Sequence, residues 1–340
     1  MSSTRSPKTR TKKITNNGPR LHEFLRELSA ETFQKGCLVT VGEAWGADIP
    51  RARLYSNPDG SELSMVFQFE QIMLDQQPGK EKWNLQPLPF VELKKSFARW
   101  QQGLHGCGFN SLFLNNHDLP RTVSHWGSDG VWRVQSAKLL ATMLHGMEGM
   151  PYIYQGEELG MTNISLPIEE YRDLESINMY HERKAAGYAE ADIMNSLHAK
   201  SRDNARTPMQ WDDSPNAGFT AGTPWLKVNP NYTDINAAQQ VDDPDSVFSY
   251  YRQLIALRKS HPVLTEGDFT LLEPEHPRLF VYCRRNATCQ LLVVCNFSDN
   301  ETEWMLPDGW ADAERLIGNY EPGPAGRLRP WEAMMLERPL

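Results

Sequence analysis

The chain has 340 residues, 40% of them hydrophobic and 23% charged, a composition that suits one large folded domain with a smaller one and excludes general disorder. Its formal net charge of −8 gives no electrostatic reason to expect a nucleic-acid partner. The sequence contains no run of about 18 or more apolar residues, so we expect neither a membrane span nor a membrane partner.

The first part of the chain, residues 1–17, is expected to be a disordered basic leader. It carries repeated Lys and Arg without the apolar segment that a secretory signal needs. Behind it, Pro19 opens a stretch in which apolar residues recur at helical spacing from Leu21 to Leu28, which predicts a helix.

Alternating strand-like and helix-like segments follow. This alternation is typical of parallel β/α units, and a closed barrel of such units needs eight strands, whereas only four are visible here. We therefore expect an α/β fold over residues 18–260, an incomplete (β/α)8 TIM barrel made of strands 5–8 and their helices. The predicted strands are Leu38–Val41 running into Glu43, Leu63–Phe69, the run from Ser111 into Asp118, and Pro151–Glu158; the predicted helices contain Leu93–Leu104 and Val134–Leu144.

The rest of the chain differs in composition. Residues 160–235 are polar and rich in Gly, Pro, Trp, Arg and Asp, which is typical of a long active-site loop. A last helix over Val247–Arg258 can be capped by Asp245 or Ser246. Short β runs then predict an antiparallel β-sandwich domain over residues 261–340. These runs are Phe269–Leu272, Leu279–Cys283, Leu291–Asn296 and Ala333–Leu336.

Two of the predicted strands end in carboxylates. Glu43 follows one strand beside Trp45, and His117 and Asp118 follow another in the segment Asn-Asn-His-Asp. Cleavage of a glycosidic bond with retention uses a pair of carboxyl groups about 5–5.5 Å apart. We expect Trp45 to desolvate Glu43 partly, as suits a general acid, and Asp118 to act as a nucleophile or to bind sugar hydroxyls beside His117. Each segment alone also fits a structural role at a strand end or helix cap.

Longer segments strengthen the sugar-binding interpretation. Tyr152-Ile-Tyr-Gln-Gly-Glu-Glu158 and Arg202-Asp-Asn-Ala-Arg-Thr-Pro-Met-Gln-Trp211 join the two carboxylate segments. Together they resemble the α-amylase superfamily, glycoside hydrolase family 13, and within it the oligo-1,6-glucosidase and dextran glucosidase group. The resemblance runs from about Gly18 to Leu340. Further matching segments are Gly18–Leu25, Asn216–Trp225 and Val228–Asn236.

The resemblance implies a role for each residue of the first sugar site. Glu43 corresponds to the general acid/base at the end of the fifth barrel strand. Asp118 corresponds to the carboxylate that grips the sugar's 2- and 3-hydroxyls, with His117 as its companion. Arg202 corresponds to the arginine that holds the glucose at the non-reducing end, which implies exo action.

Two further residues correspond to groups that contact the next sugar, Lys82 and Glu175. Structural alternatives stay open for them, since Lys82 fits a solvated loop lysine and Glu175 a surface carboxylate. Arg202 likewise fits an ion pair with Asp203 or Asp212. Glu157 and Glu158 are interpreted as structural residues at the barrel rim.

The resemblance breaks at the nucleophile. In the family, an aspartate in a Gly-x-Arg-x-Asp motif comes shortly before the Gly-Pro-Arg-Leu-His segment, whereas residues 1–17 contain no aspartate and no such motif follows. We therefore expect the chain to correspond to the C-terminal part of a family member, without the N-terminal half of the barrel. Because losing one catalytic carboxylate costs several orders of magnitude in rate, we expect impaired activity unless a complementing N-terminal half is a partner.

By resemblance, the substrate is a small oligosaccharide. The reaction implied is retaining exo-hydrolysis of α-1,6-glucosidic bonds in isomalto-oligosaccharides or dextran fragments, and the context of Trp45 favours this branch. A trehalose-6-phosphate hydrolase is the alternative within the enzyme class, and a non-catalytic remnant or sugar-binding subunit is the alternative outside it. No cofactor or metal ion is expected. The five cysteines show no Cys-x-x-Cys pattern and are expected to be reduced thiols of a cytoplasmic protein, with one local disulfide as the alternative.

Overall fold

The computed structural model describes residues 18–340, so the predicted leader lies outside the described residues. Four short parallel strands begin the fold, β1 (Val41–Glu43), β2 (Met65–Phe67), β3 (Ser111–Leu112) and β4 (Met150–Pro151). β1 pairs with β2 and β3 with β4, and a parallel bridge between Val66 and Asn110 joins the two pairs. The four predicted strands therefore exist and lie side by side, as the alternating pattern predicts.

The strands are shorter than predicted, and their first and last residues differ from those expected. The ladder of β1 begins at Val41 rather than Leu38, because Leu38 and Val39 are exposed and pair with no neighbouring strand in the described part of the chain. β3 ends at Leu112, so that Phe113 and Leu114 continue as buried extended chain toward Asp118. The apolar runs in the sequence are therefore longer than the parts of them that form the strand ladder.

Helices between the strands cover one side of them. α5 (Phe90–Leu104) buries the predicted stripe of Leu93, Phe97, Trp100 and Leu104. α7 (Arg133–His145) buries nearly its whole length between the strands and the C-terminal sheet. Shorter helices and turns connect these elements: α4 (Ile49–Tyr55), η2 (Gln71–Met73), α6 (Thr122–Trp126) and η3 (Glu157–Leu159).

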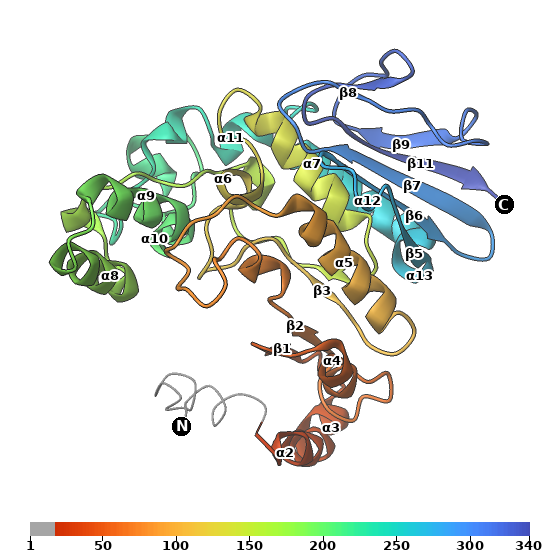
Figure 1. Ribbon diagram of the computed structural model, residues 1–340, viewed down its shortest axis with the longest axis horizontal. Helices are drawn as coiled ribbons and strands as arrows, with labels where there is room; N and C mark the ends of the chain where they lie inside the picture. Colours follow the sequence, from red (N-terminus) through yellow and green to blue (C-terminus); the bar gives the residue numbers. More distant parts are fainter. Residues whose placement is uncertain (1–17) are drawn as a thin grey trace, which may run out of the picture.

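The N-terminal helices stand apart from this core. In Figure 1, α2 (Leu21–Leu28), η1 (Ser29–Phe33), α3 (Gln34–Gly36) and α4 lie together beyond β1 and β2. The helix predicted from Leu21 is present, but none of its residues is buried. Its apolar side chains Phe24 and Leu28 are about half exposed. The helical spacing therefore predicts the element correctly, and its Leu21 and Leu25 side chains pack, partly buried, against an apolar cluster that contains Tyr55 of α4.

The segment predicted as a long active-site loop, residues 160–235, contains regular structure. It forms α8 (Leu174–Ala185), α9 (Glu190–Lys200) and α10 (Asp203–Arg206), with 3-10 turns at Ile168–Glu170, Pro215–Gly218 and Pro230–Thr233. Asp173 caps α8 by accepting a hydrogen bond from the Ser176 N–H. α8 and α9 pack together with Trp83 in a separate apolar cluster. The polar composition concealed these short amphipathic helices, so the prediction of an irregular loop was wrong for 174–200.

The C-terminal part, predicted as an antiparallel β-sandwich, contains a five-stranded antiparallel sheet. Its order is β5-β6-β7-β11-β9, and a separate two-stranded ladder pairs β8 with β10. α12 (Val247–Ser260) leads into it and is capped by Ser246, which accepts from the Ser249 N–H. The strands and the remaining helices are β5 (Asp268–Leu272), β6 (Leu279–Arg285), β7 (Cys289–Asn296), β8 (Thr302–Glu303), β9 (Glu314–Gly318), β10 (Arg327–Leu328), β11 (Ala333–Pro339), α11 (Ala237–Gln240) and α13 (Val263–Glu266).

One apolar core joins the strand-and-helix layer to the C-terminal sheet. It contains residues of α5, α7 and α12 together with residues of β6, β7 and β11. Figure 1 shows α7 and α12 lying along the face of that sheet. The buried Tyr282 hydroxyl donates to the Met143 carbonyl at 2.7 Å, and the Arg284 guanidinium donates to the Gly146 carbonyl at 2.8 Å. The two predicted domains therefore share buried polar contacts as well as apolar surface.

The five cysteines are all unpaired in the structure, which fits the prediction of reduced thiols. The helices within residues 18–340 include none with the length and apolar character needed to cross a lipid bilayer.

Candidate active site

β1 delivers Glu43 to the end of the parallel strands. In the β1–β2 ladder Glu43 is opposite Phe67, and Trp45 follows in a turn and stacks on Phe69 with ring centroids 3.9 Å apart. The Trp45 indole N–H donates a hydrogen bond to the Glu43 carboxylate. Glu43 is nevertheless exposed, so the predicted partial desolvation by Trp45 is absent from this structure. Trp45 contacts the carboxylate as a donor rather than as an apolar cover.

The segment after β3 carries His117 and Asp118 in a turn. The Asn116 side-chain oxygen accepts a hydrogen bond from the Asp118 N–H at 2.8 Å, which fixes the turn. The His117 imidazole is 64% exposed, and its Nε2 lies 3.8 Å from Asp118 Oδ1. The two side chains are thus neighbours, as predicted, with the His117 ring free to reach a ligand.

Two arginines approach the Asp118 carboxylate. Arg206 donates from Nη2 to Asp118 Oδ1 at 2.5 Å and from Nε to the His117 carbonyl at 2.8 Å. Arg202 Nε lies 3.7 Å from the same carboxylate oxygen. Charge-assisted contacts of this kind fix the orientation of a carboxylate. Arg202 therefore pairs with neither Asp203 nor Asp212, the structural alternative raised by the sequence.

The network continues to the two residues predicted at the next sugar. Arg202 Nη2 contacts Glu175 Oε2 at 3.1 Å, and Lys82 Nζ donates to the same oxygen at 2.6 Å. Lys82 Nζ also lies 4.5 Å from the centroid of the buried Trp83 ring. The structure thus connects Lys82, Glu175, Arg202 and Asp118 through successive ion pairs.

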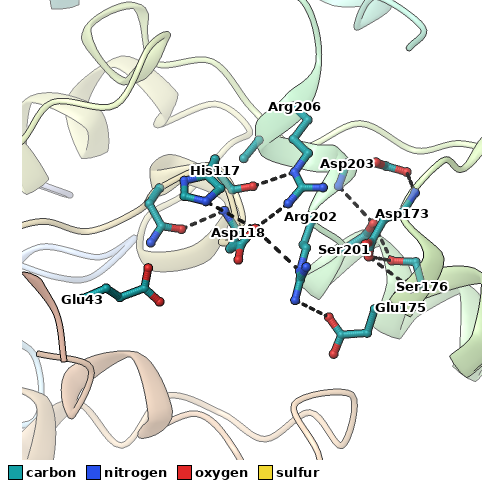
Figure 2. A network of polar contacts seen from close by, with 12 residues as sticks. Glu43, His117, Asp118, Asp173, Glu175, Ser176, Ser201, Arg202, Asp203 and Arg206 are labelled. Atoms are coloured by element: carbon teal, nitrogen blue, oxygen red, sulfur yellow. Dashed lines mark hydrogen bonds and ion pairs between the residues drawn. The ribbon is translucent and has the colours of Figure 1, made fainter. Parts of the chain in front are cut away.

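Figure 2 shows how these groups face one another. Among the labelled side chains, the Glu43 carboxylate points toward Asp118, and Arg202 and Glu175 lie beyond Asp118. A pocket of about 230 Å³ at the end of the strands is lined by Glu43, His117 and the aromatic rings of Phe67, Phe113 and Tyr152. The two predicted catalytic carboxylates therefore follow separate strands: Glu43 lines this pocket, and Asp118 lies beside the pocket residue His117.

A second layer of polar groups holds Glu175 and Arg202 in place. Asp203, just after Arg202, accepts backbone hydrogen bonds from Arg172 at 2.7 Å and Asp173 at 3.0 Å. The Ser176 hydroxyl donates to the Asp173 carboxylate at 2.7 Å, and its oxygen lies 2.8 Å from the Ser201 hydroxyl oxygen. Because these groups are buried, the start of α8 and the start of α10 are joined directly behind the exposed side chains.

Glu157 lies outside this network, as predicted for a structural residue. It is buried, and its Oε1 accepts a hydrogen bond from the Tyr251 hydroxyl at 2.9 Å. Burial raises the pKa of Glu157 to about 7. Burial also raises the pKa of the adjacent Glu158 carboxyl.

Arg206 is the site residue that the sequence interpretation missed. It follows Arg202 in Arg-Asp-Asn-Ala-Arg, and residues four apart lie on one face of a helical turn. In α10 this spacing turns both guanidinium groups toward Asp118. The four-residue spacing of Arg202 and Arg206 in the sequence therefore already indicates that their side chains lie on the same face.

Two other features bear on what the site can bind. Within residues 18–340, no group of three or more His, Cys, Asp or Glu side chains is arranged to hold a metal ion. A larger cavity of about 600 Å³ lies among the loops of the C-terminal sheet, near Trp304 and Trp310, and contains none of the predicted site residues.

Comparison with known proteins identifies the family. The model of the alpha-amylase catalytic domain matches residues 2–267. The chain belongs to the alpha-amylase family. Its C-terminal antiparallel sheet and parallel strands have counterparts in solved structures of that family.

Individual relatives agree with this assignment. The chain is 51% identical to an oligo-1,6-glucosidase of Parageobacillus thermoglucosidasius, over 93% of this chain and 58% of that enzyme. The crystal structure of a Bacillus licheniformis trehalose-6-phosphate hydrolase superposes with a TM-score of 0.91 at 46% identity, covering 96% of this chain and 60% of that one. A trehalulose synthase structure gives a TM-score of 0.91 at 36% identity, over 98% and 62%. The chain thus spans about three fifths of the length of these relatives.

Proposed function

We propose that this chain contributes the acid/base part of a retaining, exo-acting α-1,6-glucosidase of isomalto-oligosaccharides or dextran fragments. The observation that carries the proposal is that the Glu43 carboxylate points toward Asp118, which the Arg202 and Arg206 ion pairs hold in place (Figure 2). Similarity to enzymes named oligo-1,6-glucosidase and glucan 1,6-alpha-glucosidase supports the same reaction.

In this proposal the side chains have different tasks. Glu43 protonates the leaving glycosidic oxygen and then activates water, while Asp118 accepts hydrogen bonds from two hydroxyls of the bound glucose. His117 donates a hydrogen bond to the same ring, and Arg202 holds the glucose at the non-reducing end. Arg202 and Arg206 hold the Asp118 carboxylate in position to accept those hydrogen bonds.

The pair of Lys82 and Glu175 favours a neutral second sugar. Glu175 Oε2 is shared by Lys82 and Arg202, so the carboxylate lies where the second ring would meet the Lys82 ammonium. A sugar hydroxyl can bridge an ammonium and a carboxylate, whereas a phosphate that took the Lys82 ammonium would have to displace Glu175 from its ion pair. This argument ranks isomaltose above trehalose 6-phosphate, the second candidate, which the 46% identity to a trehalose-6-phosphate hydrolase supports.

The proposed active enzyme includes four further β/α units. The chain's own strands would be strands 5–8 of an eight-stranded barrel, with the nucleophilic aspartate supplied by a complementing N-terminal half. Two features support this: the outer edge of β1 is unpaired in the described part of the chain, and the chain spans 58% of its oligo-1,6-glucosidase relative. We also propose a cytoplasmic enzyme, because free thiols suit a reducing compartment.

The test uses the 340-residue chain alone and mixed with the part of the Parageobacillus enzyme that lies outside the match. The substrates are p-nitrophenyl α-glucoside, isomaltose and trehalose 6-phosphate. We expect little turnover by the chain alone and hydrolysis of isomaltose by the mixture, lost on Glu43→Gln. Turnover by the chain alone that Glu43→Gln abolishes would contradict the complementing half.

The same experiment separates the non-catalytic alternative. A sugar-binding subunit would bind isomaltose as a well-folded monomer and show no turnover in the mixture. A remnant without function would elute as a soluble aggregate and bind no sugar. Hydrolysis of trehalose 6-phosphate in preference to isomaltose would instead favour the second enzyme candidate.

A further inference from the structure

A buried polar cluster lies behind the sugar site, formed by Asp75, His125 and Lys200. Their side chains are 9%, 6% and 8% exposed. His125 Nε2 lies 2.7 Å from Asp75 Oδ2, and the Lys200 ammonium donates to that same oxygen. Lys200 Nζ and His125 Nε2 are 3.0 Å apart. One carboxylate oxygen therefore joins three segments that are far apart in the sequence.

Each segment carries a residue of the sugar site. Asp75 follows η2 and begins the stretch that leads to Lys82. His125 belongs to α6, the first helix after Asp118. Lys200 ends α9, just before Arg202. The cluster thus joins the three segments that carry Lys82, Asp118 and Arg202.

The stretch from Asp75 to Lys82 is fixed at its far end too. The carbonyl of the buried Trp83 accepts hydrogen bonds from Arg183 at 3.2 Å and from the Ser196 hydroxyl at 2.9 Å. Since Trp83 is tied to α8 and α9 and Asp75 is tied to α6 and α9, the chain between them has little freedom. Lys82, within it, reaches Glu175 from a defined position.

Electrostatics also couples the cluster to the site. Burial lowers the pKa of the Lys200 ammonium, the Asp75 carboxylate raises it, and the nearby positive charge of Lys82 lowers it further. Burial lowers the pKa of His125, so the imidazole is neutral and the Asp75–Lys200 pair is balanced. Removing the Asp75 charge would leave a buried ammonium close to Lys82.

We propose that Asp75, His125 and Lys200 are positioning residues that set the relative places of Lys82, Asp118 and Arg202 for sugar binding. This inference rests on the proposed function. Recognition of two sugar rings needs donors and acceptors held within a fraction of an ångström, and buried charge-assisted hydrogen bonds hold segments more rigidly than exposed ion pairs do.

The first experiment compares two buried lysines. Lys200→Met removes the cluster's cation, and Lys138→Met removes a buried lysine of α7 whose ammonium donates to the Asp245 carbonyl at 2.6 Å, away from the network. Affinity of the 340-residue chain for isomaltose is measured by calorimetry, together with amide hydrogen exchange of residues 76–88, well below the unfolding temperature of both variants. We expect Lys200→Met to weaken isomaltose binding about tenfold or more and to speed exchange in 76–88. Lys138→Met should change neither.

A second pair of variants keeps the test valid if Lys200→Met does not fold. His125→Gln places an amide donor near the Asp75 carboxylate, whereas His125→Leu removes the donor at similar volume. We expect His125→Gln to bind isomaltose almost as the original chain does, and His125→Leu to bind it several-fold more weakly.

Two outcomes would overturn the inference. One is equal isomaltose affinity and equal exchange in 76–88 for Lys200→Met and Lys138→Met; the other is equal loss for His125→Gln and His125→Leu. If the unaltered chain binds no isomaltose, the proposed function fails, and the exchange of residues 76–88 alone decides whether the cluster positions that stretch.

Discussion

Asp118 owes its orientation to residues that come later in the chain. Arg206 donates both to its carboxylate and to the carbonyl of the preceding His117, so a single guanidinium fixes the side chain and the turn that carries it. Lysine cannot reproduce this, since it lacks the planar fork that reaches two acceptors at once.

Arg206→Gln should weaken isomaltose binding by about tenfold or more, because a lost charge-assisted hydrogen bond of about 1.5–3 kcal/mol frees Asp118. Calorimetric titration of the 340-residue chain measures this. Arg172→Gln is the matched control, since the Arg172 side chain donates only to the Glu169 and Tyr171 carbonyls. Equal affinity in the Arg206 and Arg172 variants would show that Arg206 does not hold Asp118 for the sugar.

Glu157 makes stability depend on pH. Its pKa is about 7 in the folded chain and near 4.5 when unfolded, so above pH 4.5 the unfolded state loses the proton first and folding stability falls as pH rises toward 7. Glu157→Gln removes this loss while keeping an oxygen that can accept from Tyr251. We expect the difference in free energy of unfolding, variant minus original chain, to be larger at pH 8 than at pH 4.5 by about 3 kcal/mol.

Urea unfolding at the two pH values measures the difference. Glu169→Gln, at an exposed position, is the control and should show no comparable dependence on pH. If Glu157→Gln shifts stability equally at both pH values, the buried carboxyl is not the titrating group.

At the scale of elements, α5 links the strand layer to the C-terminal sheet through one lysine. The buried Lys94 ammonium donates to the carbonyls of Glu273, His276 and Leu279 at 2.7–2.8 Å. Glu273 and His276 lie in the connection between β5 and β6, and Leu279 begins β6. Removing a cation that binds three carbonyls leaves each of them without this donor.

Lys94→Met should therefore lower the free energy of unfolding by about 2–4 kcal/mol. Lys95→Met, on the neighbouring residue with ion pairs to Glu92 and Glu275 on the surface, should change stability little. Thermal unfolding of the two variants makes the comparison. Similar melting temperatures for both would show that the Lys94 contacts contribute nothing beyond an exposed ion pair.

The elements were predicted with unequal success, for physical reasons. α5 and α7 were predictable because each repeats apolar residues at the period of a helix that packs on a core. α8 and α9 were missed because Trp83, from a distant segment, completes their apolar cluster. Glu43 and Asp118 were recognisable from the strands before them, whereas the exposure of Glu43 depends on how its surroundings fold.

At the scale of the whole molecule, one side of the strand layer is open. Within residues 18–340, β1 pairs on one side only, and its Val41 is exposed, as are Leu38 and Val39 just before it, Val39 by 76%. An unpaired strand with apolar side chains is a template for association with other chains. The described residues place no cover over it.

The paired change Leu38→Lys and Val39→Lys should reduce self-association of the chain at micromolar concentration, since like charges on an edge strand oppose strand pairing. Light scattering against concentration measures it. The control is the paired change Met305→Lys and Leu306→Lys at exposed positions of the C-terminal part, which should leave association unchanged. If the control lowers scattering as much, the β1 edge is not the contact.

The Tyr282 and Arg284 contacts with α7 have a consequence for how the chain comes apart. A protease cut near residue 260 would separate two pieces in sequence but would leave the Met143 and Gly146 carbonyls still held by donors from the other piece. The nicked protein should accordingly stay associated and melt in one step, with dissociation of the fragments only as the fold is lost.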